Sequence, residues 1–194
     1  MALLLTLEAT AYTPNQLLSN ALGKIVLAGR SNVGKSSLLN ALGGKALAKI
    51  SSRPGKTQSI NYYRIESHPL YLIDLPGYGY AEANQERRRA WGHLMDCFFE
   101  QAKTLLTVCV LLDARLPPQD NDIAMIAYAR DSGFSVQGIL TKADKCKHNV
   151  LVAHQRIWQA TLEKPPLVTS VKTKVGLQAL RSFILSFAPP SDGE

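Results

Sequence analysis

The chain has 194 residues, of which 46% are hydrophobic and 19% are charged, and its formal net charge is +7. Its length suits one domain with a sizeable core; no apolar run approaches the roughly 18 residues of a membrane helix, and Cys97, Cys109 and Cys146 lack disulfide or metal spacing. We therefore expect a cytoplasmic protein with reduced thiols and no membrane partner, whose charge fits either a polyanionic partner or a merely basic soluble protein.

Apolar patterning predicts strands alternating with helices along the chain. Residues 1–23 form a leader of undefined structure, in which Thr13-Pro14 could begin a short helix. Strands are expected at residues 24–28, 60–65, 70–73, 107–112, 134–140 and 167–169, and helices at 37–42, 86–102, 120–131, 149–162 and 177–187. A long loop, 43–59, and a flexible tail, 188–194, complete the chain. This order predicts a three-layer α/β domain with a mostly parallel sheet.

The first strand and helix flank a phosphate-binding P-loop of the form Gly-x-x-x-x-Gly-Lys-Ser. Its residues are Gly29, Arg30, Ser31, Asn32, Val33, Gly34, Lys35 and Ser36. The two glycines let backbone N–H groups close around a phosphate at a helix N-terminus. Lys35 would place its charge on the β- and γ-phosphates, and Ser36 would offer its hydroxyl to Mg²⁺. The flanking strand and helix make a chance match in a surface loop the weaker explanation.

A second segment, Asp74-Leu75-Pro76-Gly77, follows an apolar strand. In such domains nucleotide-binding residues lie at the carboxyl ends of the parallel strands. Asp74 there can hold Mg²⁺ through water, and the Gly77 N–H can meet a γ-phosphate. Without the P-loop, a simple Pro-Gly turn would be the better explanation.

A third segment, Thr141-Lys142-Ala143-Asp144, also follows an apolar strand. The Asp144 carboxylate can accept two hydrogen bonds from guanine, which adenine cannot donate, so this residue predicts selection of GTP. The stem of Lys142 can pack along the base. After the last strand come Val168, Thr169 and Ser170, whose backbone N–H groups can reach the guanine O6. Alone, the first of these segments would be an ordinary loop and the second a strand end.

The ordered set GRSNVGKS, RPGKTQ, DLPGYGY, TKAD and VTSVK resembles the EngB family of bacterial GTPases, which is of the Era/TrmE-like class. The resemblance covers residues 24–187, which we take as the GTPase domain, with the leader packed on or preceding it. It implies a Ras-like, six-stranded sheet with one antiparallel strand and helices on both faces. It also implies a Mg²⁺-dependent GTP switch that acts in assembly of the large ribosomal subunit, contacts rRNA, and is needed for cell division and septation. We expect a monomer.

The resemblance also selects residues in the long loop. Thr57, rather than Ser51, Ser52 or Ser59, would complete the Mg²⁺ shell when a γ-phosphate is present. Its neighbours Gly55, Lys56, Gln58 and Ser59 would lie beside the nucleotide. The chain departs from the family at residues 168–170, which are usually Phe-Ser-Ser. Thr141 replaces the Asn usual in GTPases generally, although Thr is familiar in this family.

Hydrolysis would depend on Lys35, Thr57, Gly77 and Asn32, which position water and offset charge on the phosphates. Tyr78 occupies the place of the Gln that orients water in Ras-like enzymes, and a phenol cannot reproduce the amide geometry, so slow intrinsic turnover is expected. Asn32 matches the Asn that holds K⁺ in TrmE-like GTPases, although it could instead hydrogen-bond only within the loop. Stimulation by K⁺, by the ribosomal particle, or by both is therefore expected.

Several alternatives stay open at this stage. Arg87, Arg88 and Arg89 form either a solvated helix face or an RNA contact. A nucleotide-gated, non-enzymatic scaffold at the division site would need the same motifs. A P-loop kinase for a small acceptor is less consistent with Asp144 and with the lack of an Arg-rich lid. Residues 43–59 and 75–89 are the expected switch segments.

Overall fold

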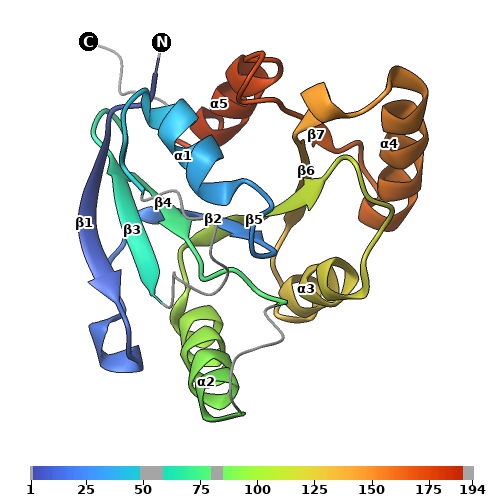
Figure 1. The fold of residues 1–194 in the computed structure, drawn as a ribbon. Coiled ribbons are helices and arrows are strands. Elements are labelled where there is room, and N and C mark those ends of the chain that lie inside the picture. Colours follow the sequence, from blue (N-terminus) through green and yellow to red (C-terminus); the bar gives the residue numbers. More distant parts are fainter. Residues whose placement is uncertain (1, 49–58, 80–84, 190–194) are drawn as a thin grey trace.

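The computed structural model describes residues 2–48, 59–79 and 85–189, and within them a seven-stranded sheet has the order β1-β3-β4-β2-β5-β6-β7 (Figure 1). The strands are β1 Leu5–Ala11, β2 Gly23–Gly29, β3 Ile60–Ile65, β4 Leu70–Asp74, β5 Leu105–Asp113, β6 Val136–Thr141 and β7 Leu167–Val168. The helices are α1 Lys35–Gly43, α2 Gln85–Gln101, α3 Asp120–Asp131, α4 His148–Leu162 and α5 Leu177–Leu185, with short 3₁₀ turns at η1 Pro14–Gln16 and η2 Ala143–Lys145. The predicted α/β alternation is confirmed.

The seventh strand corrects the prediction of six. It is β1, which comes from the leader and pairs antiparallel with β3. The alternating pattern that would have revealed it is broken by a bulge between Leu7 and Ala9, which shifts the side chains to opposite faces. Since β3 is also antiparallel to β4, it is the single strand running against the others, as predicted.

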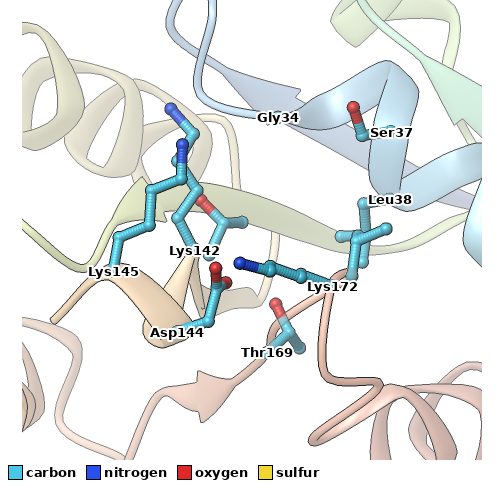
Figure 2. A pocket seen from close by; sticks show the side chains of 10 residues that line it. Gly34, Ser37, Leu38, Lys142, Asp144, Lys145, Thr169 and Lys172 are labelled. Atoms are coloured by element: carbon cyan, nitrogen blue, oxygen red, sulfur yellow. The ribbon is translucent and has the colours of Figure 1, made fainter.

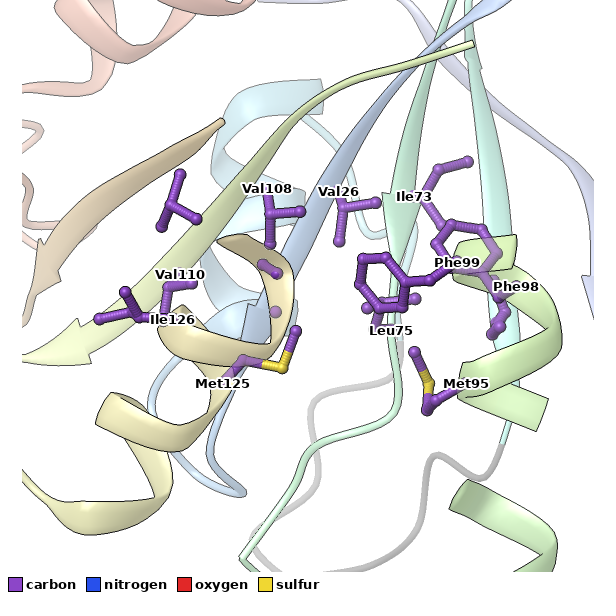
Figure 3. Packing of buried hydrophobic residues seen from close by; sticks show 14 of the residues in the cluster. Val26, Ile73, Leu75, Met95, Phe98, Phe99, Val108, Val110, Met125 and Ile126 are labelled. Atoms are coloured by element: carbon purple, nitrogen blue, oxygen red, sulfur yellow. The ribbon is translucent and has the colours of Figure 1, made fainter. Parts of the chain in front are cut away.

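Two apolar clusters hold the helices on the two faces of the sheet. One contains Leu38, Leu39 and Leu42 of α1 with Leu180 and Ile184 of α5. The other joins α2, α3 and α4 to the opposite face, and Figure 3 shows its α2 side chains Met95, Phe98 and Phe99 near Val26 and Ile73. Side chains four residues apart share one helix face, so these apolar spacings fix which side of each helix meets the sheet. None of the described helices is long and apolar enough to cross a membrane.

The parallel register brings four strand ends to one edge of the sheet. Strand β2 pairs parallel with both β4 and β5, and β5 pairs parallel with β6. Within this register Leu27 is opposite Asp74, and Asp113 is opposite Thr141. The P-loop, Asp74, Asp113 and the Thr141–Asp144 segment therefore emerge side by side, where an open α/β sheet binds its ligands.

Leu5 offers a test of whether the leader is part of the folded core. Its side chain is fully buried in the α1/α5 cluster, whereas Leu7 on the same strand is 47% exposed. We expect Leu5→Ala to lower the free energy of unfolding by about 2–5 kcal/mol, because it leaves a cavity. Leu7→Ala is the matched control and should change it by less than about 1 kcal/mol. Equal effects of the two variants in urea unfolding would contradict the placement of β1.

Candidate nucleotide-binding site

The P-loop connects the end of β2 to the start of α1 through left-handed backbone. Gly34 caps α1 with φ +110°, a conformation that side chains strongly disfavour, and Asn32 has φ +65°. Gly29 is needed for a different reason, because a Cβ there would lie 2.8 Å from Val33 Cγ1 and 3.1 Å from Leu111 Cβ. The unpaired N–H groups of the first α1 turn therefore follow directly on a loop shaped for an anion.

Two carbonyl groups of this loop are held by the last residue of β6 and the residue that follows it. The Thr141 hydroxyl donates to the Val33 carbonyl at 2.7 Å, and the Lys142 ammonium donates to the Asn32 carbonyl at 2.6 Å. Carbonyls fixed on the outside of a loop let N–H groups turn toward the hollow. In this loop the Ser31 and Val33 N–H groups are exceptions, because they donate to the Tyr78 and Arg30 carbonyls at 3.1 and 3.2 Å. The guanine-recognition segment predicted from the sequence therefore also supports the phosphate loop.

Lys35 and Asp74 form a buried ion pair between α1 and the end of β4. Their side chains are 7% and 3% exposed, so each charge depends on the other. Ser36 is half-buried in the same first turn of α1. Asp74 and Ser36 offer the oxygen donors that Mg²⁺ prefers, and Lys35 offers a cation to phosphate. Among the described residues there is no group of three or more His, Cys, Asp or Glu that could hold a metal.

The segment after β4, residues 75–79, runs along the P-loop. Tyr78 donates its N–H to the Gly29 carbonyl at 3.3 Å, and its carbonyl accepts from the Ser31 N–H at 3.1 Å. Gly77 packs flat on Ser31, since a Cβ at Gly77 would lie 3.2 Å from the Ser31 backbone. Leu75 and Pro76 are buried and connect this segment to β4. The structure thus brings the Asp74–Gly77 motif and the P-loop together.

The Tyr78 side chain turns toward α3 instead of standing free. Its hydroxyl donates to Asp122 Oδ1 at 2.9 Å. Burial, with the negative charge of Asp122, raises the pKa of the phenol well above its ordinary value. Tyr78 is therefore a neutral hydrogen-bond donor whose one proton is already committed.

A pocket of about 310 Å³ lies between the P-loop and the two segments predicted to hold the base (Figure 2). Its lining residues are Gly34, Ser37, Leu38, Thr141, Lys142, Asp144, Lys145, Thr169, Val171 and Lys172. The Ser170 hydroxyl donates to Asp144 Oδ1 at 2.6 Å, and it accepts from the Thr173 N–H at 3.1 Å. The bond from Ser170 lowers the pKa of Asp144, so the carboxylate is ionised and oriented at the rim of the pocket.

The backbone N–H groups of residues 168–170 are less available for contact with guanine than the sequence predicted. Val168 pairs with β6, the Thr169 N–H donates to the Leu140 carbonyl at 2.7 Å, and the Ser170 N–H donates to the Val175 carbonyl at 3.0 Å. A contact between either of these N–H groups and guanine would require an existing bond to break. The next residue, Val171, lines the pocket and was missed, although its position directly after Ser170 was a usable signal.

The structure does not place some of the residues that the sequence predicted for the site. Gly55, Lys56, Thr57 and Gln58 lie outside the described residues, as do Ser51 and Ser52. Ser59 is described and buried, and its hydroxyl points to Asn61 Oδ1 at 3.4 Å. The side chains of Arg87 and Arg88 also lie outside the description, whereas Arg89 is exposed on α2.

Asp113 at the end of β5 is a site residue that sequence reasoning missed. It accepts from Lys142 Nζ at 2.8 Å and from Arg115 Nε and Nη2 at 2.8 and 2.7 Å. Burial tends to raise the pKa of Asp113, but these hydrogen bonds outweigh it and lower the pKa to about 2. Asp113 therefore anchors the lysine that supports the P-loop. Its signal was the same as that of Asp74, an aspartate directly after an apolar strand.

Comparisons with known proteins agree with this site. A family model described as "50S ribosome-binding GTPase" matches residues 24–142. A curated relative from Desulfovibrio desulfuricans, a probable GTP-binding protein EngB, is 48% identical over 181 residues, which cover 93% of this chain and 90% of the relative. The crystal structure of a probable GTP-binding protein engB has a TM-score of 0.68 and 22% identity, covering 84% of this chain and 97% of that one.

A more distant neighbour is NFeoB from S. thermophilus, solved with GDP·AlF₄⁻ and K⁺. It has a TM-score of 0.61 and 20% identity, covering 89% of this chain and 65% of that one. At this identity the likeness concerns the fold alone. The sequence match to the curated relatives is much closer and spans nearly the full length of both chains. The chain therefore belongs to the EngB family of GTP-binding GTPases.

Proposed function

We propose that this chain is a Mg²⁺-dependent, GTP-hydrolysing switch that acts in the cytoplasm on the large ribosomal subunit or its precursor, and that division and septation depend on it through that role. The observation that carries the enzymatic part is the connection of the P-loop to the guanine pocket. The bonds from Thr141 and Lys142 to Val33 and Asn32 hold the P-loop beside the segment that contains Asp144, which supports one nucleotide site spanning both. The family description and the charge of +7 support a ribosomal, rRNA-containing partner.

In this proposal each residue has a defined task. P-loop N–H groups and Lys35 would bind the β- and γ-phosphates. Ser36, Thr57 and, through water, Asp74 would hold Mg²⁺, which would supply neutralisation of the phosphate charge. Gly77 donates its N–H to the γ-phosphate. Water attacks the γ-phosphorus, the bond to the β–γ bridging oxygen breaks, and GDP and phosphate leave.

In this proposal two residues, Asp144 and Val171, hydrogen-bond to the guanine base. Asp144 accepts from the N1–H and N2–H₂ groups of guanine, and Ser170 holds that carboxylate in place. Val171 is the better candidate to donate to O6, because the N–H groups of Thr169 and Ser170 already have acceptors. The stem of Lys142 covers the base from the side of the P-loop.

One observation favours the scaffold alternative enough to test it. The Tyr78 hydroxyl is bonded to Asp122, so this side chain offers nothing to orient the attacking water. A protein that binds GTP without turnover would fit that arrangement. The guanine pocket around Asp144 gives no comparable support to a small-molecule kinase.

Turnover and sedimentation together decide between these functions. We expect slow GTP hydrolysis by the isolated protein, faster hydrolysis with large ribosomal subunits, and co-sedimentation with those subunits in a GTP analogue but not in GDP. Lys35→Ala, which removes the charge on the phosphates, should lower GTP binding or turnover at least about tenfold. Binding to subunits without any turnover would favour the scaffold. Equal sedimentation in both nucleotides would contradict a switch.

Asp144 provides the test of nucleotide choice. Asp144→Asn should weaken GTP binding at least about tenfold and improve binding of xanthosine triphosphate, whose 2-oxo group needs a donor. Competition against a fluorescent nucleotide measures both effects. Asp131→Asn, an exposed acid at the end of α3, is the matched control and should leave both affinities unchanged. If native protein bound ATP as well as GTP, the guanine assignment would be lost.

Asn32 provides the test of K⁺ activation. Its exposed side chain lines a polar cavity with Ser31 and Lys142. We expect hydrolysis to be roughly tenfold faster in K⁺ than in Na⁺ at equal ionic strength, because a suitably placed cation offsets charge on the transferred phosphoryl group.

The Asn32→Ala variant should remove this difference and leave GDP binding largely intact. The exposed Asn149 at the start of α4 supplies the control, and Asn149→Ala should keep the native K⁺ response. Identical initial rates of native protein in the two salts would show that the ribosomal particle must supply the whole activation.

A further inference from the structure

A cluster of Arg30, Tyr78 and Asp122 joins three elements that the nucleotide contacts alone would not connect. Arg30 lies in the P-loop, Tyr78 in the segment of residues 75–79, and Asp122 in the first turn of α3. The Tyr78 hydroxyl donates to Asp122 Oδ1 at 2.9 Å, and Arg30 Nη1 lies 4.0 Å from Asp122 Oδ2. The two oxygens of the Asp122 carboxylate thus face one residue of the P-loop and one residue beside it.

Asp122 is an unusual place for a charge, since the residue is only 3% exposed. Its position as the third residue of α3 favours a carboxylate, because helix N-termini attract negative charge. Burial nevertheless raises the pKa of Asp122, against the opposing effects of the Tyr78 bond and the Arg30 charge. A buried ion pair is seldom the best way to stabilise a fold. This arrangement suggests that the carboxylate serves the two residues it holds.

Tyr78 is fixed at both ends. Its backbone bonds to Gly29 and Ser31, and its ring reaches α3. Gly79, which follows, has φ +77°, and a Cβ there would lie 3.0 Å from Asn121 Nδ2, so the chain after Tyr78 also turns closely onto α3. Movement of Tyr78 away from the P-loop would break its backbone bonds to Gly29 and Ser31 and would strain the bond of its hydroxyl to Asp122.

We propose that Tyr78 is a positioning residue, held by Asp122 and Arg30, that keeps the Gly77 N–H against the P-loop at the γ-phosphate position. This inference rests on the proposed GTPase function and deepens it. The Gly77 N–H would meet only the third phosphate, so the cluster adds affinity for GTP and none for GDP. It also connects α3 to that contact, because α3 carries the carboxylate on which the ring is held.

The chain contains a matched control for this cluster. Tyr128 of α3 donates its hydroxyl to Asp96 Oδ1 of α2 at 2.7 Å, a bond of the same chemistry among residues that line neither the base pocket nor the P-loop. Tyr78→Phe and Tyr128→Phe each remove one oxygen from a Tyr–Asp pair. The Tyr128 pair is exposed whereas Asp122 is buried, so Tyr128→Phe controls for the chemistry of the lost bond and not for its burial.

Nucleotide affinity is the first measurement. We expect Tyr78→Phe to weaken binding of a non-hydrolysable GTP analogue by about fivefold, the usual effect of one hydrogen bond, with GDP affinity changed less than about twofold. Asp122→Ala should act alike, Asp122→Asn should stay close to native because it keeps an acceptor oxygen, and the Tyr78→Phe/Asp122→Ala pair should lose little more than either alone. Tyr128→Phe should change neither affinity.

Hydrogen exchange of the nucleotide-free protein is the second measurement and does not depend on GTPase activity. The amides of residues 77–79 should exchange faster in Tyr78→Phe and Asp122→Ala than in native protein or Tyr128→Phe. Unchanged exchange in folded Tyr78→Phe would overturn the positioning role, as would equal losses of GDP and analogue affinity. Native protein that neither binds nor hydrolyses GTP would instead defeat the proposed function, while the exchange result would still decide whether the cluster holds residues 77–79.

Discussion

The nucleotide site depends on the way the outer face of the P-loop is supported. The left-handed backbone at Asn32 and Gly34 curves the loop, and carbonyls on its outer side then need donors from elsewhere in the chain. Thr141 and Lys142 do this at 2.7 and 2.6 Å. Because they stand just before Asp144, the distance between the phosphate loop and the base pocket is set by one short peptide at the end of β6.

Three cations around the P-loop each have an aspartate from a neighbouring element. Lys35 pairs with Asp74, Lys142 with Asp113, and Arg30 lies close to Asp122. Such pairing avoids leaving an isolated charge in a partly buried place. Arrival of a phosphate with its metal ion would exchange partners, since Lys35 could pass to phosphate and Asp74 to the cation.

The sequence predicted where the motifs made of adjacent residues lie in the fold. The P-loop, the Asp74–Gly77 turn and the Thr141–Asp144 segment are continuous motifs, and apolar strands before them told which edge they share. Contacts between residues far apart in the chain could not be predicted from the sequence. Asp113 meets Lys142 across 29 positions, and Tyr78 meets Asp122 across 44, so both aspartates looked like ordinary ends of elements. Strand β1 was hidden because its bulge interrupts the alternation that predicts a strand.

Tyr78 shows how these two kinds of information combine. From the sequence, its phenol could be judged only by what it lacks, the paired donor and acceptor of a water-orienting amide. In the fold its hydroxyl donates a hydrogen bond to Asp122, while its backbone hydrogen-bonds to the P-loop. A side chain anchored on α3 cannot also follow an attacking water. Tyr78, which fixes the Gly77 peptide, thus stands where Ras-like enzymes have the Gln that orients the attacking water. The absence of that amide is a physical reason for the proposed slow hydrolysis and its dependence on an activator.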